Sequence, residues 1–268
     1  MPVVSVNGIR IYYELHGPED AQVLVLSNGV LMSTASWGYQ TPVLSRRHRL
    51  LLYDCRGQWQ SDHPPGPYSM ELHADDLAGL LQALDIQRAH IGGISYGAEI
   101  SLVFALKYPK MTRSLIVSSA VSQVDPLLRG IIGMWIGAAR RKDPDLFYQV
   151  TYPFNFSQRW IAANAQLLEQ ARERYATLDY EAVVHLCQAF LELDITADLR
   201  RINIPTLVMV GEEDLLKPRR YADIIARQIP HAEYVVIPSS GHAVCWEQPD
   251  VFNSLVLGFL GKQGGKDS

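Results

Sequence analysis

The strongest constraint on the fold is a series of short, mainly apolar runs that alternate with helical stretches. Six such runs follow one another along the chain, at residues 23–26, 50–53, 89–91, 114–117, 206–210 and 234–237. Runs without polar alternation are typical of strands that are buried on both faces, as in a parallel sheet between two layers of helices. The sequence therefore predicts an α/β domain with mostly parallel strands.

A β-hairpin is expected ahead of these runs. Residues 3–6 and 9–14 are rich in β-branched and aromatic side chains, and they flank the dipeptide Asn7-Gly8. Asn-Gly favours a type I′ turn, because both central residues of that turn need a positive φ angle. Two antiparallel strands added to the six buried runs predict an eight-stranded, mostly parallel sheet flanked by helices.

One long region interrupts the alternation of strands and helices. Residues 124–198 contain no convincing strand, but they contain helical stretches rich in Trp, Tyr, Met and Leu. Because this region lies between two strand–helix units, we expect a helical cap inserted over one end of the sheet. The predicted core domain is then 1–123 together with 199–268, and the predicted cap is 124–198.

The composition limits the functional classes. The 268 residues are 48% hydrophobic and 19% charged, as in an ordinary globular enzyme, and the net charge of −4 predicts no nucleic-acid partner. No apolar run approaches the roughly 18 residues of a membrane span. Cys55, Cys187 and Cys245 form neither a disulfide framework nor a metal-binding pattern, and the N-terminus lacks a signal-peptide pattern. We therefore expect a cytoplasmic protein with no metal site.

The chemistry is centred on residues 93–97, which read Gly-Ile-Ser-Tyr-Gly. This G-x-S-x-G motif lies between a predicted strand and a predicted helix. A strand–turn–helix elbow forces the serine into a tight turn that exposes its hydroxyl at the edge of the sheet. The motif predicts that Ser95 is a nucleophile.

A serine nucleophile needs a base, and the base needs a carboxylate. His242 lies in the loop after the last predicted strand, and Asp214 follows the strand at 206–210. Both loops leave the same sheet edge as the elbow and keep the chain order Ser, Asp, His that is expected of such a fold. We predict a catalytic triad of Ser95, Asp214 and His242. Glu212, Glu213 and Asp125 compete with Asp214 for the role of the acid, with Asp125 as the main alternative.

The transition state of acyl transfer also needs backbone N–H donors for an oxyanion. One donor should be Tyr96, directly after the nucleophile. The other should come from the turn after the strand at 23–26, where Gly29 permits a sharp bend and the N–H of Val30 is the predicted donor. Asn28, in the same turn, is predicted to border the substrate pocket, although an ordinary structural turn is the alternative.

The predicted cap is unusually rich in large apolar side chains. These residues are Met134, Trp135, Phe147, Tyr148, Phe154, Phe156 and Trp160. Part of this set should pack as ordinary core between the cap and the sheet. The sharper hypothesis is that Met134, Trp135, Phe147, Phe154 and Trp160 line an apolar acyl pocket above Ser95.

Nearly the whole chain resembles α/β-hydrolase fold enzymes that carry a helical cap. Gly241-His242-Ala243, together with residues 248–253, is similar to the aminoacrylate hydrolase and 3-oxoadipate enol-lactonase groups. Asn28-Gly29 with residues 33–37, and residues 202–205 running into 211–214, instead resemble acyltransferases that move 3-hydroxyacyl chains from acyl carrier protein. Those acyltransferases usually lack the first glycine of the elbow, which is present here as Gly93.

These observations favour a carboxylic ester hydrolase that forms an acyl-enzyme on Ser95. The expected substrate is a small-molecule ester, lactone or acyl thioester. No cofactor is expected, because the chain has neither a phosphate-binding P-loop motif nor a dinucleotide-binding fingerprint. Two alternatives are an acyltransferase that passes the acyl chain to a hydroxyl or thiol, and a non-catalytic ligand receptor. The intact Ser95, Asp214 and His242 argue against the receptor.

Overall fold

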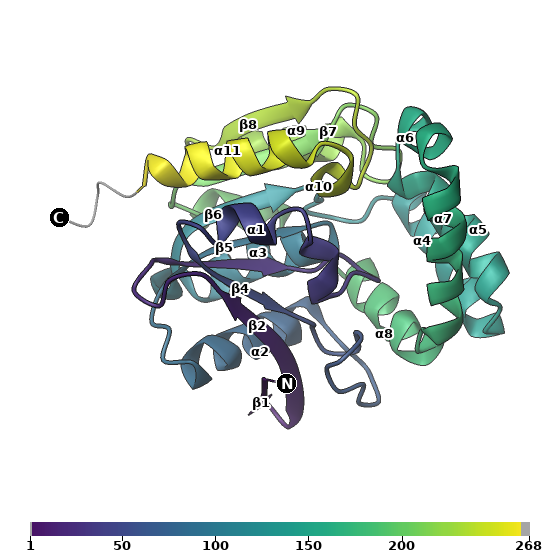
Figure 1. The fold of residues 1–268 in the computed structure, drawn as a ribbon, viewed down its shortest axis with the longest axis horizontal. Helices are drawn as coiled ribbons and strands as arrows, with labels where there is room; N and C mark the ends of the chain where they lie inside the picture. The colour runs from purple at the N-terminus through teal and green to yellow at the C-terminus, as the bar shows by residue number, and fades with distance from the viewer. Residues whose placement is uncertain (1, 264–268) are drawn as a thin grey trace.

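The computed structural model describes residues 2–263 and contains one eight-stranded sheet (Figure 1). The strand order across the sheet is β1-β2-β4-β3-β5-β6-β7-β8. The strands are β1 Val3–Val6, β2 Ile9–His16, β3 Val23–Ser27, β4 Arg49–Tyr53, β5 Ala89–Ile94, β6 Thr112–Ser118, β7 Thr206–Gly211 and β8 Glu233–Ile237. All eight predicted strands are present.

The sheet is antiparallel at one edge and parallel elsewhere. The pairs β1–β2 and β2–β4 are antiparallel, while the five pairs from β4 through β3 to β8 are parallel. The hairpin at Asn7-Gly8 has the predicted positive φ angles, 46° and 76°. This arrangement confirms the mostly parallel, eight-stranded α/β sheet that the apolar runs predict.

Alternate residues of the buried strands face two separate hydrophobic layers. Val25 and Leu51 pack into one layer of apolar side chains, whereas their neighbours Leu24 and Leu50 pack into the other layer, and helices contribute to both. Both faces of these strands are therefore apolar, because side chains along a strand point alternately to opposite faces. This two-sided burial explains the continuous apolar runs in the sequence.

Most helices of these layers connect one strand to the next, and the last two follow β8. They are α1 Thr41–Leu44, α2 Met70–Ala83, α3 Tyr96–Lys107, α9 Arg219–Gln228, α10 Val244–Glu247 and α11 Pro249–Gly261, with short 3₁₀ turns η1 Thr34–Trp37, η2 Pro109–Met111 and η4 Thr196–Arg201. Helix α2 begins where the hydroxyl of Ser69 accepts a hydrogen bond from the backbone N–H of Leu72. Such a cap satisfies one of the free donors of a helix start.

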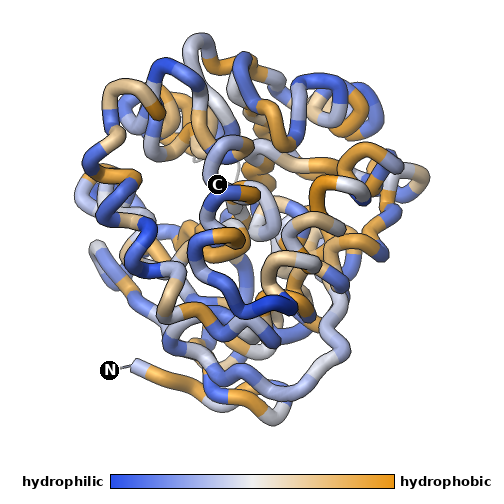
Figure 2. Tube along the Cα trace, turned by 90° about the vertical axis from the view of Figure 1, so that its right-hand side faces the viewer, coloured by the Kyte–Doolittle hydropathy of each residue, from blue (hydrophilic) through white to orange (hydrophobic). Residues whose placement is uncertain are grey.

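Between β6 and β7 the chain forms a helical insertion, which lies at one end of the sheet (Figure 1). It contains α4 Pro126–Arg141, α5 Pro144–Asn155, α6 Gln158–Ala163, α7 Ala165–Arg174, η3 Tyr175–Thr177 and α8 Tyr180–Leu191. Asp125, Asp143, Ser157 and Asp179 cap the starts of α4, α5, α6 and α8. Hydrophilic and hydrophobic residues alternate along the traces of the helices, as Figure 2 shows.

The two ends of the insertion meet in a short antiparallel neck. The backbone N–H of Val124 donates to the carbonyl of Leu193 (3.3 Å), and that of Ile195 donates to the carbonyl of Ser122 (2.8 Å). The division into a core and a cap at residues 124 and 198 stays a prediction. Among the described residues, no helix is long and apolar enough to cross a membrane.

Candidate active site

Ser95 lies at a sharp turn between β5 and α3. Its backbone has φ 54° and ψ −123°, a strained conformation of the kind that concentrates at functional sites. The two glycines of the motif allow this turn: a Cβ atom at Gly93 would lie 2.5 Å from the carbonyl oxygen of Gly97, and one at Gly97 would clash with the carbonyl oxygen of Ser27. The side chain of Ser95 is thus held at the end of the parallel strands.

Asp214 and His242 are brought together by the loops after β7 and β8. The Nδ1 atom of His242 lies 2.8 Å from Oδ2 of Asp214. The other oxygen of Asp214 accepts the backbone N–H of Lys217 at 2.8 Å, and both residues of the pair are buried. The hydroxyl of Ser119 donates to the carbonyl of His242 (3.0 Å) and steadies the histidine loop.

The free ring nitrogen of the histidine shares a cavity with the serine. Nε2 of His242 has no hydrogen-bond partner within residues 2–263, and both His242 and Ser95 line the same pocket. The hydroxyl of Ser95 instead accepts a hydrogen bond from Nζ of Lys217 at 3.2 Å. Hydrogen bonds between a nucleophile and its base often tighten only when substrate is bound.

The competing carboxylates have other positions. Asp125 caps helix α4, where one oxygen accepts the backbone N–H of Leu128 at 2.8 Å and the other faces Arg220. Glu212 is exposed and accepts the N–H of Ser239, and Glu213 is exposed as well. Of the four candidates, Asp214 is the one hydrogen-bonded to His242.

The predicted oxyanion turn lies beside Ser95. Strands β3 and β5 are parallel neighbours, so the turn after Ser27 meets the elbow, and a Cβ atom at Gly29 would lie 3.5 Å from Cβ of Ser95. Val30 and Tyr96 both line the pocket. Within the described part of the chain, neither of their backbone N–H groups has a hydrogen-bond acceptor.

Asn28 does not border the pocket, contrary to the prediction. Its side chain is buried, where Oδ1 accepts Nε1–H of Trp37 (2.7 Å) and Nδ2 donates to Asp54 (3.1 Å). Asp54 also accepts the backbone N–H of Thr34 at 2.9 Å, and burial raises the pKa of its carboxyl to about 6. Asn28 therefore anchors the turn at residues 28–30, and the adjacent Gly29 and Val30 line the cavity.

A buried ion pair that was not predicted from the sequence contacts Ser95. Nζ of Lys217 lies 2.8 Å from both carboxylate oxygens of Glu99, in addition to its contact with Ser95. Burial lowers the pKa of Lys217 and raises that of Glu99, while each partner opposes the shift of the other. In the sequence, Glu99 follows Ser95 by four residues and Lys217 follows Asp214 by three. This closeness to predicted catalytic residues is the one sequence feature that could have pointed to the pair.

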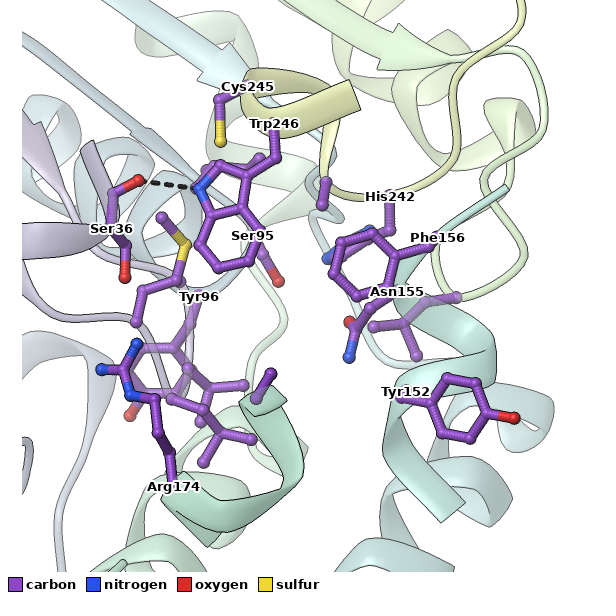
Figure 3. Close-up of a pocket in the computed structure, with 18 of the residues that line it drawn as sticks. Ser36, Ser95, Tyr96, Tyr152, Asn155, Phe156, Arg174, His242, Cys245 and Trp246 are labelled. Carbon is purple, nitrogen blue, oxygen red and sulfur yellow. Dashed lines mark hydrogen bonds between the residues drawn. The ribbon is translucent and has the colours of Figure 1, made fainter. Parts of the chain in front are cut away.

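A cavity of about 540 Å³ lies between the helical insertion and the end of the sheet, with Ser95 and His242 in its wall (Figure 3). This volume is in the range typical of small-molecule sites. The rest of the wall is mainly aliphatic and aromatic. It includes Leu31, Met32, Ile132, Trp135, Tyr148, Tyr152, Phe156, Trp160, Leu168, Phe190 and Trp246.

Two of the five cap residues predicted for the pocket line it, namely Trp135 and Trp160. Met134 is exposed to solvent, with a relative exposure of 48% for the residue, and Phe147 is fully buried against Tyr175 and Tyr180 inside the insertion. Phe154 packs against the main hydrophobic core. Consecutive residues of a helix point about 100° apart, so a shift of one position moves a side chain off the pocket face.

Several wall residues lie outside the predicted set. Asn155 and Tyr152 reach the cavity from α5, and Arg174 reaches it from the end of α7 (Figure 3). The guanidinium of Arg174 lies 4.7 Å from the ring centre of Trp59. Phe156 stacks on Trp160, with ring centres 4.2 Å apart. The aromatic richness of the insertion signalled such a wall, but not which residues would form it.

The thiols of the cavity are not competing nucleophiles. Cys187 and Cys245 line the pocket as free, buried cysteines, and burial raises the pKa of each thiol to about 12. A thiol with such a pKa is protonated at neutral pH, whereas the reactive form is the thiolate. Within residues 2–263, no three His, Cys, Asp or Glu side chains are grouped so as to hold a metal ion.

Comparison with known families decides the classification. The sequence profile described as the alpha/beta hydrolase fold matches residues 22–249. The chain belongs to the α/β-hydrolase fold family. The resemblance to α/β-hydrolases, the enol-lactonase group among them, is therefore confirmed.

Three relatives of this α/β-hydrolase cover nearly its whole length. It is 31% identical to the putative carbamate hydrolase RutD of Pantoea ananatis (strain LMG 20103), over 96% of each chain. The structure of MGS-M2, an alpha/beta hydrolase enzyme from a Medee basin deep-sea metagenome library, matches with 33% identity and a TM-score of 0.93, over 97% of each chain. The enol-lactonase from Burkholderia xenovorans LB400 matches with 26% identity and a TM-score of 0.91, over 97% of this chain and 100% of that one. These relatives support hydrolase activity.

Proposed function

We propose that the protein is a serine hydrolase that cleaves a carboxylic ester, lactone or thioester through an acyl-enzyme on Ser95. One observation carries this proposal. His242 has its Nδ1 bound to Asp214 at 2.8 Å, and its free Nε2 belongs to the same cavity as the strained Ser95. A base held in one tautomer beside a hydroxyl is the arrangement that activates a serine.

In the acylation step, the hydroxyl of Ser95 attacks the carbonyl carbon and gives its proton to Nε2 of His242. Asp214 keeps Nδ1 protonated and stabilises the imidazolium that forms. His242 then passes the proton to the leaving alcohol or thiol. In the deacylation step, water loses a proton to His242, attacks the acyl carbon and releases Ser95, which takes the proton back.

The tetrahedral intermediates of both steps carry a negative oxygen. In our proposal, the backbone N–H groups of Val30 and Tyr96 bind this oxygen. Their lack of an acceptor within the described residues and their position on the cavity wall support this role. Removing one such donor typically costs about 10²–10³ in rate.

The size and chemistry of the cavity favour an apolar acyl group. A small carbamate would leave most of about 540 Å³ empty, and most of the wall around it would consist of aliphatic and aromatic side chains. A chain of several carbons would bury its surface against Trp135, Phe156 and Trp160. We therefore place acyl-chain esters and lactones ahead of carbamates as substrates, and we keep a carbamate as a test compound because of the relatives named RutD.

A fluorophosphonate probe and a substrate panel test the proposal together. The probe should label the wild-type protein on Ser95 and should leave Ser95→Ala unlabelled. The panel should contain p-nitrophenyl esters of increasing chain length, a lactone, a 3-hydroxyacyl thioester and a carbamate, and Ser95→Ala should turn over none of them. Labelling of Ser95→Ala at the wild-type rate would overturn the assignment of the nucleophile.

The acceptor of the acyl group is the second part of the test. A hydrolase should release free acid even when an alcohol is present at high concentration. Formation of a new ester as the main product, measured by mass spectrometry, would instead identify an acyltransferase.

A further inference from the structure

The ion pair of Lys217 and Glu99 lies directly behind the proposed nucleophile. The ammonium of Lys217 has three donors, and its partners are the two oxygens of Glu99 at 2.8 Å and the hydroxyl of Ser95 at 3.2 Å. The exposed fractions of the two charged side chains are 3% and 0%. The pair is therefore withdrawn from solvent. It contacts the proposed reacting atoms through one hydrogen bond, from Nζ of Lys217 to Oγ of Ser95.

Stability is a weak explanation for this pair. Two charges lose their hydration when they are buried, and replacing such a pair by apolar side chains is often neutral or stabilising. The ammonium of Lys217 also lies 4.6 Å from the ring centre of Phe190, a cation–π contact that offsets only part of this cost. Something other than folding energy is therefore needed to account for a lysine at this position.

Each member of the pair is also tied to the proposed triad through the backbone. The N–H of Glu99 donates to the carbonyl of Ser95 (3.1 Å), and the N–H of Lys217 donates to the carboxylate of Asp214 (2.8 Å). The carboxylate of Glu99 is fixed in turn by the N–H of Val121 at 2.9 Å. The direction of the ammonium towards Ser95 is thus set by three separate segments of the chain.

We propose that Lys217 is a catalytic residue that donates a hydrogen bond to Oγ of Ser95, and that Glu99 is the positioning residue that keeps it charged and aimed. The proposal rests on the acyl-enzyme chemistry proposed above. As Oγ bonds to the acyl carbon, its proton passes to His242. As that bond breaks again, Oγ takes the proton back from His242. Lys217 keeps its own protons throughout and stabilises the negative charge that Oγ carries in both transition states.

The test measures how fast a fluorophosphonate reacts with Ser95 in the folded protein. Lys217→Met removes the donor and keeps the length of the side chain. We expect the labelling rate and kcat to fall by about 10- to 100-fold, the usual value of a hydrogen bond from a charged donor. KM should change less than kcat, because the three hydrogen bonds of the ammonium are made to Ser95 and Glu99.

A double variant separates catalysis from folding. Lys217→Met alone leaves the carboxylate of Glu99 buried without its partner, which is destabilising. Lys217→Met/Glu99→Gln removes both charges and keeps an acceptor for the N–H of Val121. We expect this double variant to recover most of the thermal stability and to keep the slow labelling of Lys217→Met. Arg56→Met is the matched control, since it breaks a second buried pair, with Asp76, that does not contact Ser95. It should lose stability and still label at the wild-type rate.

Wild-type labelling in Lys217→Met/Glu99→Gln would overturn the inference and leave the proposed function standing, because the pair would then be structural only. Labelling that persists in Ser95→Ala would overturn the proposed function itself. The two failures are thereby distinguished in one series of measurements.

Discussion

The carboxylate of Glu247 accepts a hydrogen bond from the hydroxyl of Ser157 at 2.5 Å. Ser157 caps the start of α6 in the helical insertion, and Glu247 ends the short helix α10 that follows the histidine loop. Glu247 also accepts the backbone N–H of Gly241 at 3.0 Å, one residue before His242. The contact therefore joins the insertion to the loop that carries the proposed base.

We predict that Glu247 and Ser157 act as one unit in catalysis. Glu247→Gln and Ser157→Ala should each lower kcat/KM, because either change loosens the histidine loop from the insertion. The double variant should be no worse than the poorer single variant, since neighbouring residues of one network are not additive. A double-mutant cycle of kcat/KM checks this, and fully additive losses would show that the two side chains act independently.

If Asp214 is the acid of the triad, Asp214→Asn and Asp125→Asn should have very different effects on kcat. Asp214→Asn should reduce kcat by about 10⁴, because Asn favours the wrong tautomer of His242. Asp125→Asn should leave kcat close to the wild-type value, since Asn caps a helix about as well as Asp. Steady-state kinetics on both variants checks the prediction. The reverse order would move the acid to the loop after β6.

The apolar cavity predicts a dependence on acyl-chain length. Each buried methylene contributes about 0.8 kcal/mol, so kcat/KM should rise nearly fourfold per carbon from acetate towards hexanoate. It should level off where the cavity ends. A steady fall with chain length would instead favour a small polar substrate.

A pair of variants locates the wall of that cavity. Trp160→Ala enlarges the cavity and should move the best substrate to a longer chain. Met134→Ala is the control, because Met134 is exposed on the outside of the insertion and should leave the chain-length profile unchanged. Identical profiles for the two variants would contradict an acyl pocket at Trp160.

Because His73 is buried, we expect it to make the free energy of unfolding depend on pH. Burial and the nearby Arg56 lower the pKa of His73 to about 3, and its Nε2 lies 2.8 Å from the hydroxyl of Tyr96. Between pH 6.5 and 3 the unfolded chain then binds a proton that the folded state does not, so His73 makes stability fall as the pH falls. From pH 7 to pH 5, the wild type should lose about 2 kcal/mol more unfolding free energy than His73→Gln. Urea denaturation measures the difference, and equal losses in both proteins would contradict it.

Much of the fold and the proposed triad follows from local sequence. Runs such as residues 23–26 are apolar at every position because both faces of their strands are covered, and this pattern is visible without coordinates. The carboxyl ends of parallel strands share one edge of the sheet. Ser95, Asp214 and His242 each follow a different parallel strand, so their shared location could be predicted from the strand pattern alone.

The orientation of the helices in the insertion could not be predicted in this way. The pattern around Met134 and Trp135 shows an apolar helix, but it does not show how the helix is rotated about its axis. That rotation depends on how α4 packs against α8 and α5, which places Trp135 on the cavity and Met134 in solvent. The role of Asn28 was likewise set by distant partners, Trp37 and Asp54.

The sequence by itself determined the order of the proposed catalytic loops along the chain, in which the elbow with Ser95 is followed by the loop of Asp214 and then by the loop of His242. This was possible because a nucleophile elbow and the ends of parallel strands are local features of the chain. Only the tertiary structure decided that Lys217 reaches Glu99 and Ser95, which precede it by 118 and 122 residues. A buried ion pair depends on the desolvation and the exact approach of side chains from separate segments, and neither leaves a periodic pattern in the sequence.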